Sequence, residues 1–199
     1  MNIAELHSQA LDATREVIAG VRQGQRAAPT PCLGWNVRAL VNHVVAGNLP
    51  AAELAAGKTI SEVGDHLDGD LPGADPLGAY DASAKAAAAV FATPRALKAP
   101  CAVSYGPVPG AVYAGHHFID VLIHDWDVAV ATRQDTKLRP VLVDACLDIV
   151  APQAELLRTS GAFGDKSSWR TPAMRKPTCW PRWGDEREMT AALYRTGRE

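Results

Sequence analysis

Residues 113–128 read YAGHHFIDVLIHDWDV, and this stretch says more about the fold than any other part of the sequence. On a helix that turns by about 100° per residue, five of its polar residues fall within about 80° of one another. They are Tyr113, His117, Asp120, His124 and Asp127. The rest of the circumference is mostly apolar, which is typical of a buried helix whose polar stripe faces groups that satisfy it. The stretch therefore predicts a central helix, over about residues 111–132, with a polar site along one side.

The flanking sequence predicts further helices packed around this one. Apolar residues recur at steps of three or four in four other segments, and turn-rich stretches with proline and glycine separate them. These predicted helices span residues 3–23, 36–57, 76–93 and 140–157. Asn36 is a good N-cap for the second of them, and the acidic, glycine-rich stretch 61–78 predicts an exposed loop. Helices of this length joined by loops predict an all-α, antiparallel four-helix bundle with an additional C-terminal helix.

The change in composition after Phe163 predicts a boundary between two parts of the chain. Residues 1–163 form the predicted bundle, and residues 164–199 form an irregular tail dense in tryptophan and proline. Because structureless segments of this length are uncommon inside compact domains, we expect the tail either to lie over the bundle or to be poorly ordered. No function is assigned to it.

The composition excludes several classes of function. Hydrophobic residues make up 47% of the chain and the formal net charge is −2, so the protein has no basic field for nucleic acid or an anionic membrane. No apolar run approaches the roughly 18 residues of a membrane span, and residues 1–5 lack the features of a signal peptide. The cysteines lack CxxC spacing, which argues against a zinc ribbon or a disulfide framework. We therefore expect a cytoplasmic protein that binds neither nucleic acid nor a membrane.

A metal site is one interpretation of the polar stripe. Asp120 and His124 are four residues apart, so one cation can bind both side chains. A third ligand is expected from a facing helix, and His43 lies at the edge of the apolar face of the predicted helix 36–57, with Gly47 leaving room beside it. Two histidines and one carboxylate leave a coordination position vacant, which is typical of catalytic metal sites. The alternative is a buried hydrogen-bond network without metal.

Two motifs carry a resemblance to a known family. Residues 30–45 read TPCLGWNVRALVNHVV, and residues 117–129 read HFIDVLIHDWDVA. Together they resemble the two metal-binding motifs of a DinB-like family, typified by the N-terminal domain of mycothiol-dependent maleylpyruvate isomerase. The resemblance implies metal ligands at His43, Asp120 and His124, the same residues that helix spacing brings together. The isomerase has glutamate at the acidic position, so the carboxylate of Asp120 is shorter by one methylene.

The resemblance also implies a chemistry. Members of the family that the chain resembles are implicated in transfer or isomerisation reactions that use a low-molecular-weight thiol such as mycothiol. The metal binds this thiol as thiolate. We therefore expect a divalent ion, zinc or nickel, and a thiol-dependent transferase or isomerase that acts on a small electrophile. The isomerase itself has a further C-terminal domain that helps to form its site, so its own substrate does not transfer to this chain.

Two other functions stay open from the sequence. The first is a metal-binding bundle without turnover, which sequesters a ligand at the vacant position. The second is a metal-free helical interaction module, and an exposed apolar helix face would favour a homodimer in either case.

Several residues near the predicted ligands have more than one interpretation. His117 is a satisfied buried histidine, a hydrogen-bond donor to the site or a fourth ligand. Cys32 is a small buried hydrophobic residue or a reactive thiol. Asp125 and Asp127 either orient a ligand histidine or are solvated near the helix end. His7 carries no signal.

Overall fold

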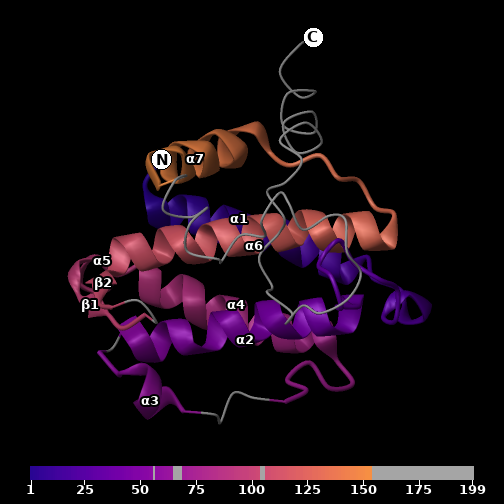
Figure 1. Ribbon diagram of the computed structural model, residues 1–199, viewed down its shortest axis with the longest axis horizontal. Coiled ribbons are helices and arrows are strands. Elements are labelled where there is room, and N and C mark those ends of the chain that lie inside the picture. Colours follow the sequence, from indigo (N-terminus) through magenta and orange to yellow (C-terminus); the bar gives the residue numbers. More distant parts are fainter. Residues whose placement is uncertain (56, 65–68, 104–105, 154–199) are drawn as a thin grey trace, which may run out of the picture.

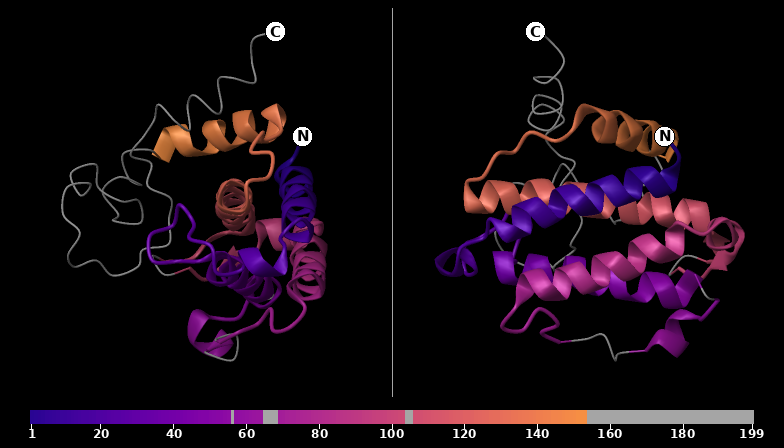
Figure 2. Two further views of the ribbon diagram at one scale, coloured as in Figure 1. Left: turned by 90° about the vertical axis from the view of Figure 1, so that its right-hand side faces the viewer. Right: turned by 180° about the vertical axis from the view of Figure 1, so that it is seen from behind.

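The computed structural model describes residues 1–55, 57–64, 69–103 and 106–153. Within these residues, four long helices form a bundle (Figure 1). They are α1 (Ile3–Ala19), α2 (Val37–Ala55), α4 (Pro76–Phe91) and α6 (Gly110–Thr132). Helix α1 packs most extensively on α6, and α2 packs most extensively on α4, so the bundle consists of two helix pairs (Figure 2). The predicted all-α bundle is confirmed.

The two helices of each pair run in the same direction, and the two pairs run in opposite directions (Figure 1). Side-chain contacts follow this arrangement, because His7 bonds His117 near the start of α1 and Thr14 bonds the carbonyl of Val121 further along both helices. Since α2 and α4 are parallel, the chain between them has to return along the outside of the bundle. The acidic stretch predicted as an exposed loop belongs to this connection, which also contains the short helix α3 (Ile60–Val63).

Local sequence signals account for where the helices begin. The Asn2 side chain accepts from the backbone N–H of Glu5 and the Glu5 carboxylate accepts from that of Asn2, which forms a capping box at α1. Asn36 accepts from the N–H of Ala39 at 2.9 Å, as predicted for α2. Asp75 caps α4, which has a proline at its first position.

The predicted central helix is confirmed as α6. It lies between α1 and α2 and is buried at fifteen of its 23 residues. Its apolar side chains join those of α1 and α2 in the main core, which contains the buried residues Leu6, Leu11, Leu40, Val44, Phe118 and Leu122. The polar stripe of α6 is therefore enclosed by the bundle.

The remaining elements are short or lie outside the four-helix core. Helix α7 (Pro140–Val150) packs on α1 and α6 and is the predicted additional helix, followed by the 3-10 turn η2 (Ala151–Gln153). Between α4 and α6 lie α5 (Pro94–Lys98) and two paired strands, β1 (Pro100–Cys101) and β2 (Val108–Pro109). A further 3-10 turn, η1 (Gln23–Gln25), follows α1. None of the two- to five-residue elements is predicted, because they are too short to show a period.

No helix in the described part of the chain is both long and apolar enough to cross a membrane. The predicted irregular tail, residues 164–199, lies outside the described residues, as does the end of the helix predicted to reach residue 157. The boundary between bundle and tail stays a prediction.

Candidate metal centre

The structure brings the three predicted ligands together. Asp120 and His124 lie one turn apart on α6, and His43 faces them from α2. The Nε2 atom of His43 is 3.3 Å from Asp120 Oδ2, and the Nε2 atom of His124 is 3.4 Å from Asp120 Oδ1. One ligand atom from each residue lies within 4.8 Å of the other two. The shorter carboxylate of aspartate thus reaches both imidazoles.

The site is more open on the α2 side than at its base. The side chain of His124 is fully buried, that of Asp120 is 14% exposed and that of His43 is 31% exposed. The Trp35 ring packs against His43, with ring centroids 5.1 Å apart. A small molecule can therefore approach past His43, while Asp120 and His124 are held inside the bundle.

The electrostatics of the centre favour a positive charge. Burial would raise the pKa of Asp120, but the imidazoles of His124 and His43 beside it outweigh this effect and hold the pKa well below its usual range. Burial would lower the pKa of His124, but Asp120, Asp127 and Cys32 outweigh it and raise the pKa well above its usual value. The carboxylates thus stabilise a cation at this point, whether a proton or a metal ion.

A second carboxylate orients the buried histidine. Asp127 Oδ2 lies 3.0 Å from Nδ1 of His124 and accepts a hydrogen bond from the N–H at that nitrogen. The lone pair of Nε2 then lies on the side of Asp120 and His43. A carboxylate on the far nitrogen is the usual partner of a metal-binding histidine, so the orienting interpretation of Asp127 has geometric support.

The loop before α2 supplies a further contact to Asp127. The Cys32 thiol donates to Asp127 Oδ2 at 3.3 Å, and Sγ lies 3.9 Å from His124 Nδ1. Burial is the main reason that the pKa of Cys32 is raised, so this side chain is a thiol at neutral pH rather than a reactive thiolate. Positive φ at Gly34 lets the loop turn back, and the Trp35 N–H bonds the Cys32 carbonyl, which holds Cys32 against α6.

The donor set fits a divalent ion. Nε2 of His124 is buried and forms no hydrogen bond within the described part of the chain, although Asp120 and His43 stand beside it. Two imidazole nitrogens and a carboxylate oxygen are the ligands that zinc and nickel accept. These residues would hold such an ion, with at least one coordination position left for a small molecule.

His117 lies beside Asp120 without belonging to the group of three ligand atoms, and Asp125 lies apart from it. Nδ1 of His117 is 2.7 Å from Nε2 of His7, a residue that the sequence does not single out. Asp125 lies beside Glu16 and Arg139, and burial is the main reason that its pKa is raised to about 7. Asp125 thus lies with Glu16 and Arg139, whereas Asp127 bonds His124, so Asp125 does not orient that histidine. The helical period does indicate that His7 is buried, because it shares the buried face of α1 with Leu6 and Ala10.

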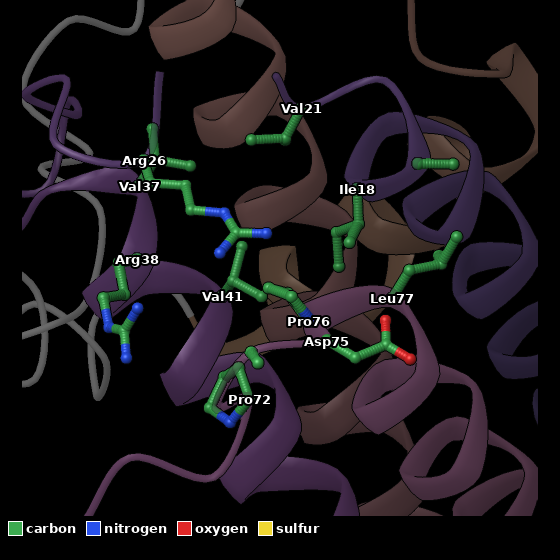
Figure 3. Close-up of a pocket in the computed structure, with 12 residues that line it drawn as sticks. Ile18, Val21, Arg26, Val37, Arg38, Val41, Pro72, Asp75, Pro76 and Leu77 are labelled. Atoms are coloured by element: carbon green, nitrogen blue, oxygen red, sulfur yellow. The ribbon is translucent and has the colours of Figure 1, made fainter. Parts of the chain in front are cut away.

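A separate pocket lies between the end of α1 and the starts of α2 and α4 (Figure 3). It has a volume of about 140 Å³, and the side chain of Arg26 extends into it among Ile18 and Val41. Its lining includes none of the three predicted ligands. This pocket is distinct from the candidate metal centre.

Comparison with known proteins agrees with the fold and with the motifs. The model of the mycothiol maleylpyruvate isomerase N-terminal domain matches residues 7–129. Two proteins of Mycobacterium tuberculosis, one from each of two strains and both named only as uncharacterized, are 37% identical to the chain over 154 residues. The match covers 74% of this chain and 79% of each relative. No solved structure matches significantly. Because this family model spans more than half of the chain, the chain belongs to the family of the mycothiol maleylpyruvate isomerase N-terminal domain. This family is DinB-like, metal-binding and mycothiol-related.

Proposed function

We propose that this protein is a metal-dependent transferase or isomerase that uses a low-molecular-weight thiol, such as mycothiol, on a small electrophile. The observation that carries the proposal is the convergence of His43, Asp120 and His124, whose ligand atoms lie within 4.8 Å of one another. Family membership supports the same chemistry, because the family is metal-binding and mycothiol-related.

The described residues have separate tasks in this proposal. A divalent ion, zinc or nickel, would supply Lewis acidity that lowers the pKa of a thiol, so that the nucleophilic thiolate exists at neutral pH. His43, Asp120 and His124 hold the ion, and Asp127 keeps the proton of His124 on Nδ1, away from it. The half-exposed side at His43 and Trp35 is the route for the thiol and the electrophile.

Other parts of the proposal rest on composition. The net charge of −2 supports small-molecule partners rather than nucleic acid, and the cysteines that the structure describes are buried and free, which is compatible with the cytoplasm. Exposed apolar side chains, including Val112 on α6 and Val141 on α7, offer contacts for a homodimer.

A bundle that binds metal without turnover is the second candidate. It is favoured by the depth of the site, since His124 is fully buried and Asp120 nearly so. Under this alternative the ion binds a thiol or water, but no electrophile reaches it.

Metal analysis of protein purified without an affinity tag tests the centre. We expect near-stoichiometric zinc or nickel in the parent and a strong loss of metal in His43→Ala, Asp120→Ala and His124→Ala. His116→Ala, a histidine on the same helix outside the trio, is the matched control and is expected to keep its metal. Full occupancy in the His124 variant would contradict the ligand assignment.

Assays against a panel of electrophiles, with and without mycothiol or bacillithiol, then test the chemistry. Thiol-dependent turnover that disappears in the metal-depleted variants supports the enzyme. Metal and thiol binding without turnover on any electrophile supports the sequestering bundle instead.

A further inference from the structure

A second polar feature of α6 faces the candidate metal centre. His117 is buried, and its Nε2 atom has no hydrogen-bond partner among the described residues. Its other nitrogen is occupied, because Nδ1 lies 2.7 Å from Nε2 of His7 on α1. A buried nitrogen without a hydrogen-bond partner lowers the stability of the fold, so the groups around it indicate which ligand it could bind.

Those surroundings are a gap on the facing helix, at Gly47 of α2. A Cβ atom placed on Gly47 would lie 3.5 Å from Nε2 of His117 and 3.9 Å from Oδ2 of Asp120. Both distances are ordinary van der Waals contacts, so the glycine is not required by crowding. Its missing side chain leaves a space that borders His117 on one side and the Asp120 carboxylate on the other.

The neighbours of His117 decide which nitrogen carries its proton. The 2.7 Å contact between His117 Nδ1 and His7 Nε2 is a hydrogen bond in which one nitrogen donates and the other accepts, so the proton of His117 is either on Nδ1 or on Nε2. A proton on Nε2 lies on the side of the Asp120 carboxylate, whose charge attracts it. A proton on Nδ1 would instead turn a lone pair toward this carboxylate. The favoured tautomer therefore has His117 protonated at Nε2, with His7 donating from its own Nε2 to His117 Nδ1.

We propose that His117 donates a hydrogen bond from Nε2 to a carbonyl oxygen of the small molecule that occupies the space beside Asp120, and that His7 positions this donor. The inference rests on the proposed function and deepens it, since it selects thiols or electrophiles that carry a carbonyl group close to the metal centre. His117 is thus a binding residue, and His7 acts through it.

Two other roles agree less well with the geometry. Among the described residues, His117 has no ligand atom in the cluster formed by His43, Asp120 and His124, so the structure does not place it as a fourth metal ligand. A proton relay through His7 would need a partner for His7 Nδ1, which is buried and has none among the described residues.

The tautomer is tested first, on the full chain supplemented with zinc. Two-bond proton–nitrogen correlation spectra of protein labelled with ¹⁵N-histidine distinguish the two tautomers. We expect His117 protonated at Nε2 and accepting at Nδ1. Protonation at Nδ1 overturns the inference, whatever the protein binds.

Binding of two matched thiols tests the donor. In mercaptoacetamide the carbon next to the CH₂–SH group is a carbonyl carbon, whereas in ethanethiol it is a methyl carbon. Absorption of the cobalt-substituted protein reports coordination of the sulfur of either thiol. We expect His117→Phe to weaken mercaptoacetamide binding about fivefold and to change ethanethiol binding less than twofold. His7→Phe is expected to reproduce part of this loss, and His7→Gln to restore it, because the amide can again donate to His117. An equal change for both thiols overturns the inference.

The same measurements separate this inference from the proposed function. If the parent protein takes up no cobalt, both the inference and the proposed function are wrong, and metal analysis identifies that case. If cobalt is bound but neither thiol coordinates, the proposed function fails, and acetate replaces the thiols as the probe. Equal acetate affinity in the parent and in His117→Phe then overturns the inference, whereas a weaker affinity in the variant supports the donor without a thiol. A loss of cobalt in His117→Phe as large as in His43→Ala makes His117 a ligand and also overturns it.

Discussion

His124 is the residue on which the centre depends, because both of its ring nitrogens face a carboxylate. Nδ1 is bonded to Asp127 at 3.0 Å, and Nε2 lies 3.4 Å from Asp120 at a fully buried position. The first contact determines the tautomer, and the second places the free lone pair among the ligands. The two carboxylates would therefore affect a bound metal ion in different ways.

Asp127→Asn tests the orienting contact. The amide keeps the size of the side chain but removes the charge that stabilises His124 with its proton on Nδ1. We expect the affinity for zinc to fall by about 10- to 100-fold, as for similar contacts to ligand histidines. Competition with a chromophoric chelator measures the affinity. Asp148→Asn, an exposed aspartate on α7, is the control, and an equal affinity in Asp127→Asn and the parent would contradict the role.

His7 is expected to make stability depend on acidity. Burial, followed by the charge of His117, lowers the pKa of His7 to about 3. Between this pH and the usual value near 6.5, the unfolded chain binds a proton that the folded chain does not. The free energy of unfolding therefore falls as the pH falls through this window, by up to about 1.4 kcal/mol per unit from this group.

His7→Phe removes this contribution and the bond to His117, while the new ring can still pack against Phe91. We expect the variant to be less stable than the parent at pH 7, with the difference shrinking by roughly 1–2 kcal/mol at pH 5. Urea unfolding in the presence of a chelator measures it. A difference that is the same at both pH values would show that His7 is not held neutral.

The residues of the centre were accessible to sequence reasoning to different degrees. Asp120, His124 and Asp127 share a helix, so the period alone places them on one stripe. His43 lies on another helix, so its place in the site follows from the resemblance or from the expectation that the helix over residues 36–57 faces α6. The contacts of Cys32 and His7 arise only when a loop and another helix fold against α6, and no local pattern encodes them.

At the scale of the helices, α2 contains both a glycine and a proline within its span. Gly47 lowers helix propensity, and Pro50 lacks the N–H that would bond the preceding turn. Their presence in the helix that carries His43 costs stability. The space beside Asp120 gives Gly47 a functional reason, whereas nothing in the structure explains Pro50.

Gly47→Ala tests that reason. The added methyl makes only van der Waals contacts at 3.5 and 3.9 Å, so we expect α2 to be stabilised by up to about 1 kcal/mol. The same methyl fills the space between His117 and Asp120, so binding of a carbonyl-bearing thiol should weaken while zinc affinity stays within about threefold. Thermal melting and cobalt absorption report the two effects. A variant that melts higher and still binds mercaptoacetamide as the parent does would remove the functional reason.

Sequence signals predict the elements better than their directions. Asn36, Asp75 and the prolines at helix starts mark the beginnings of α2, α4 and α7. The parallel direction of α2 and α4 depends on the path of the long connection between them. The sequence of that connection shows no hydrophobic period from which its path could be predicted. Pattern alone therefore predicts a bundle but not which helices pair.

For the whole molecule, the candidate centre lies at the junction of the two helix pairs. His43 belongs to the α2–α4 pair, and Asp120 and His124 belong to the α1–α6 pair. An ion held by all three joins these pairs, whereas the unfolded chain has no preformed site. Metal binding is then coupled to folding of the bundle.

This coupling predicts a thermal shift. Free zinc at 100 times its dissociation constant stabilises the folded state by about 2.7 kcal/mol, which corresponds to roughly 5–10 °C for a chain of this size. We expect the parent to melt higher by this amount in zinc than in a chelator. The His43→Ala/His124→Ala double variant should show no difference, and an equal shift in that variant would place the stabilising metal elsewhere.

The parallel pairing also determines how the bundle can open. Helices α1 and α6 form one unit and α2 and α4 the other, so a local fluctuation can separate the two units without melting either of them. Amide hydrogens on the inner faces of α2 and α6 would exchange with solvent through this motion. A bound ion would slow their exchange, while amides of α7, which packs outside both pairs, would exchange at the same rate with or without it.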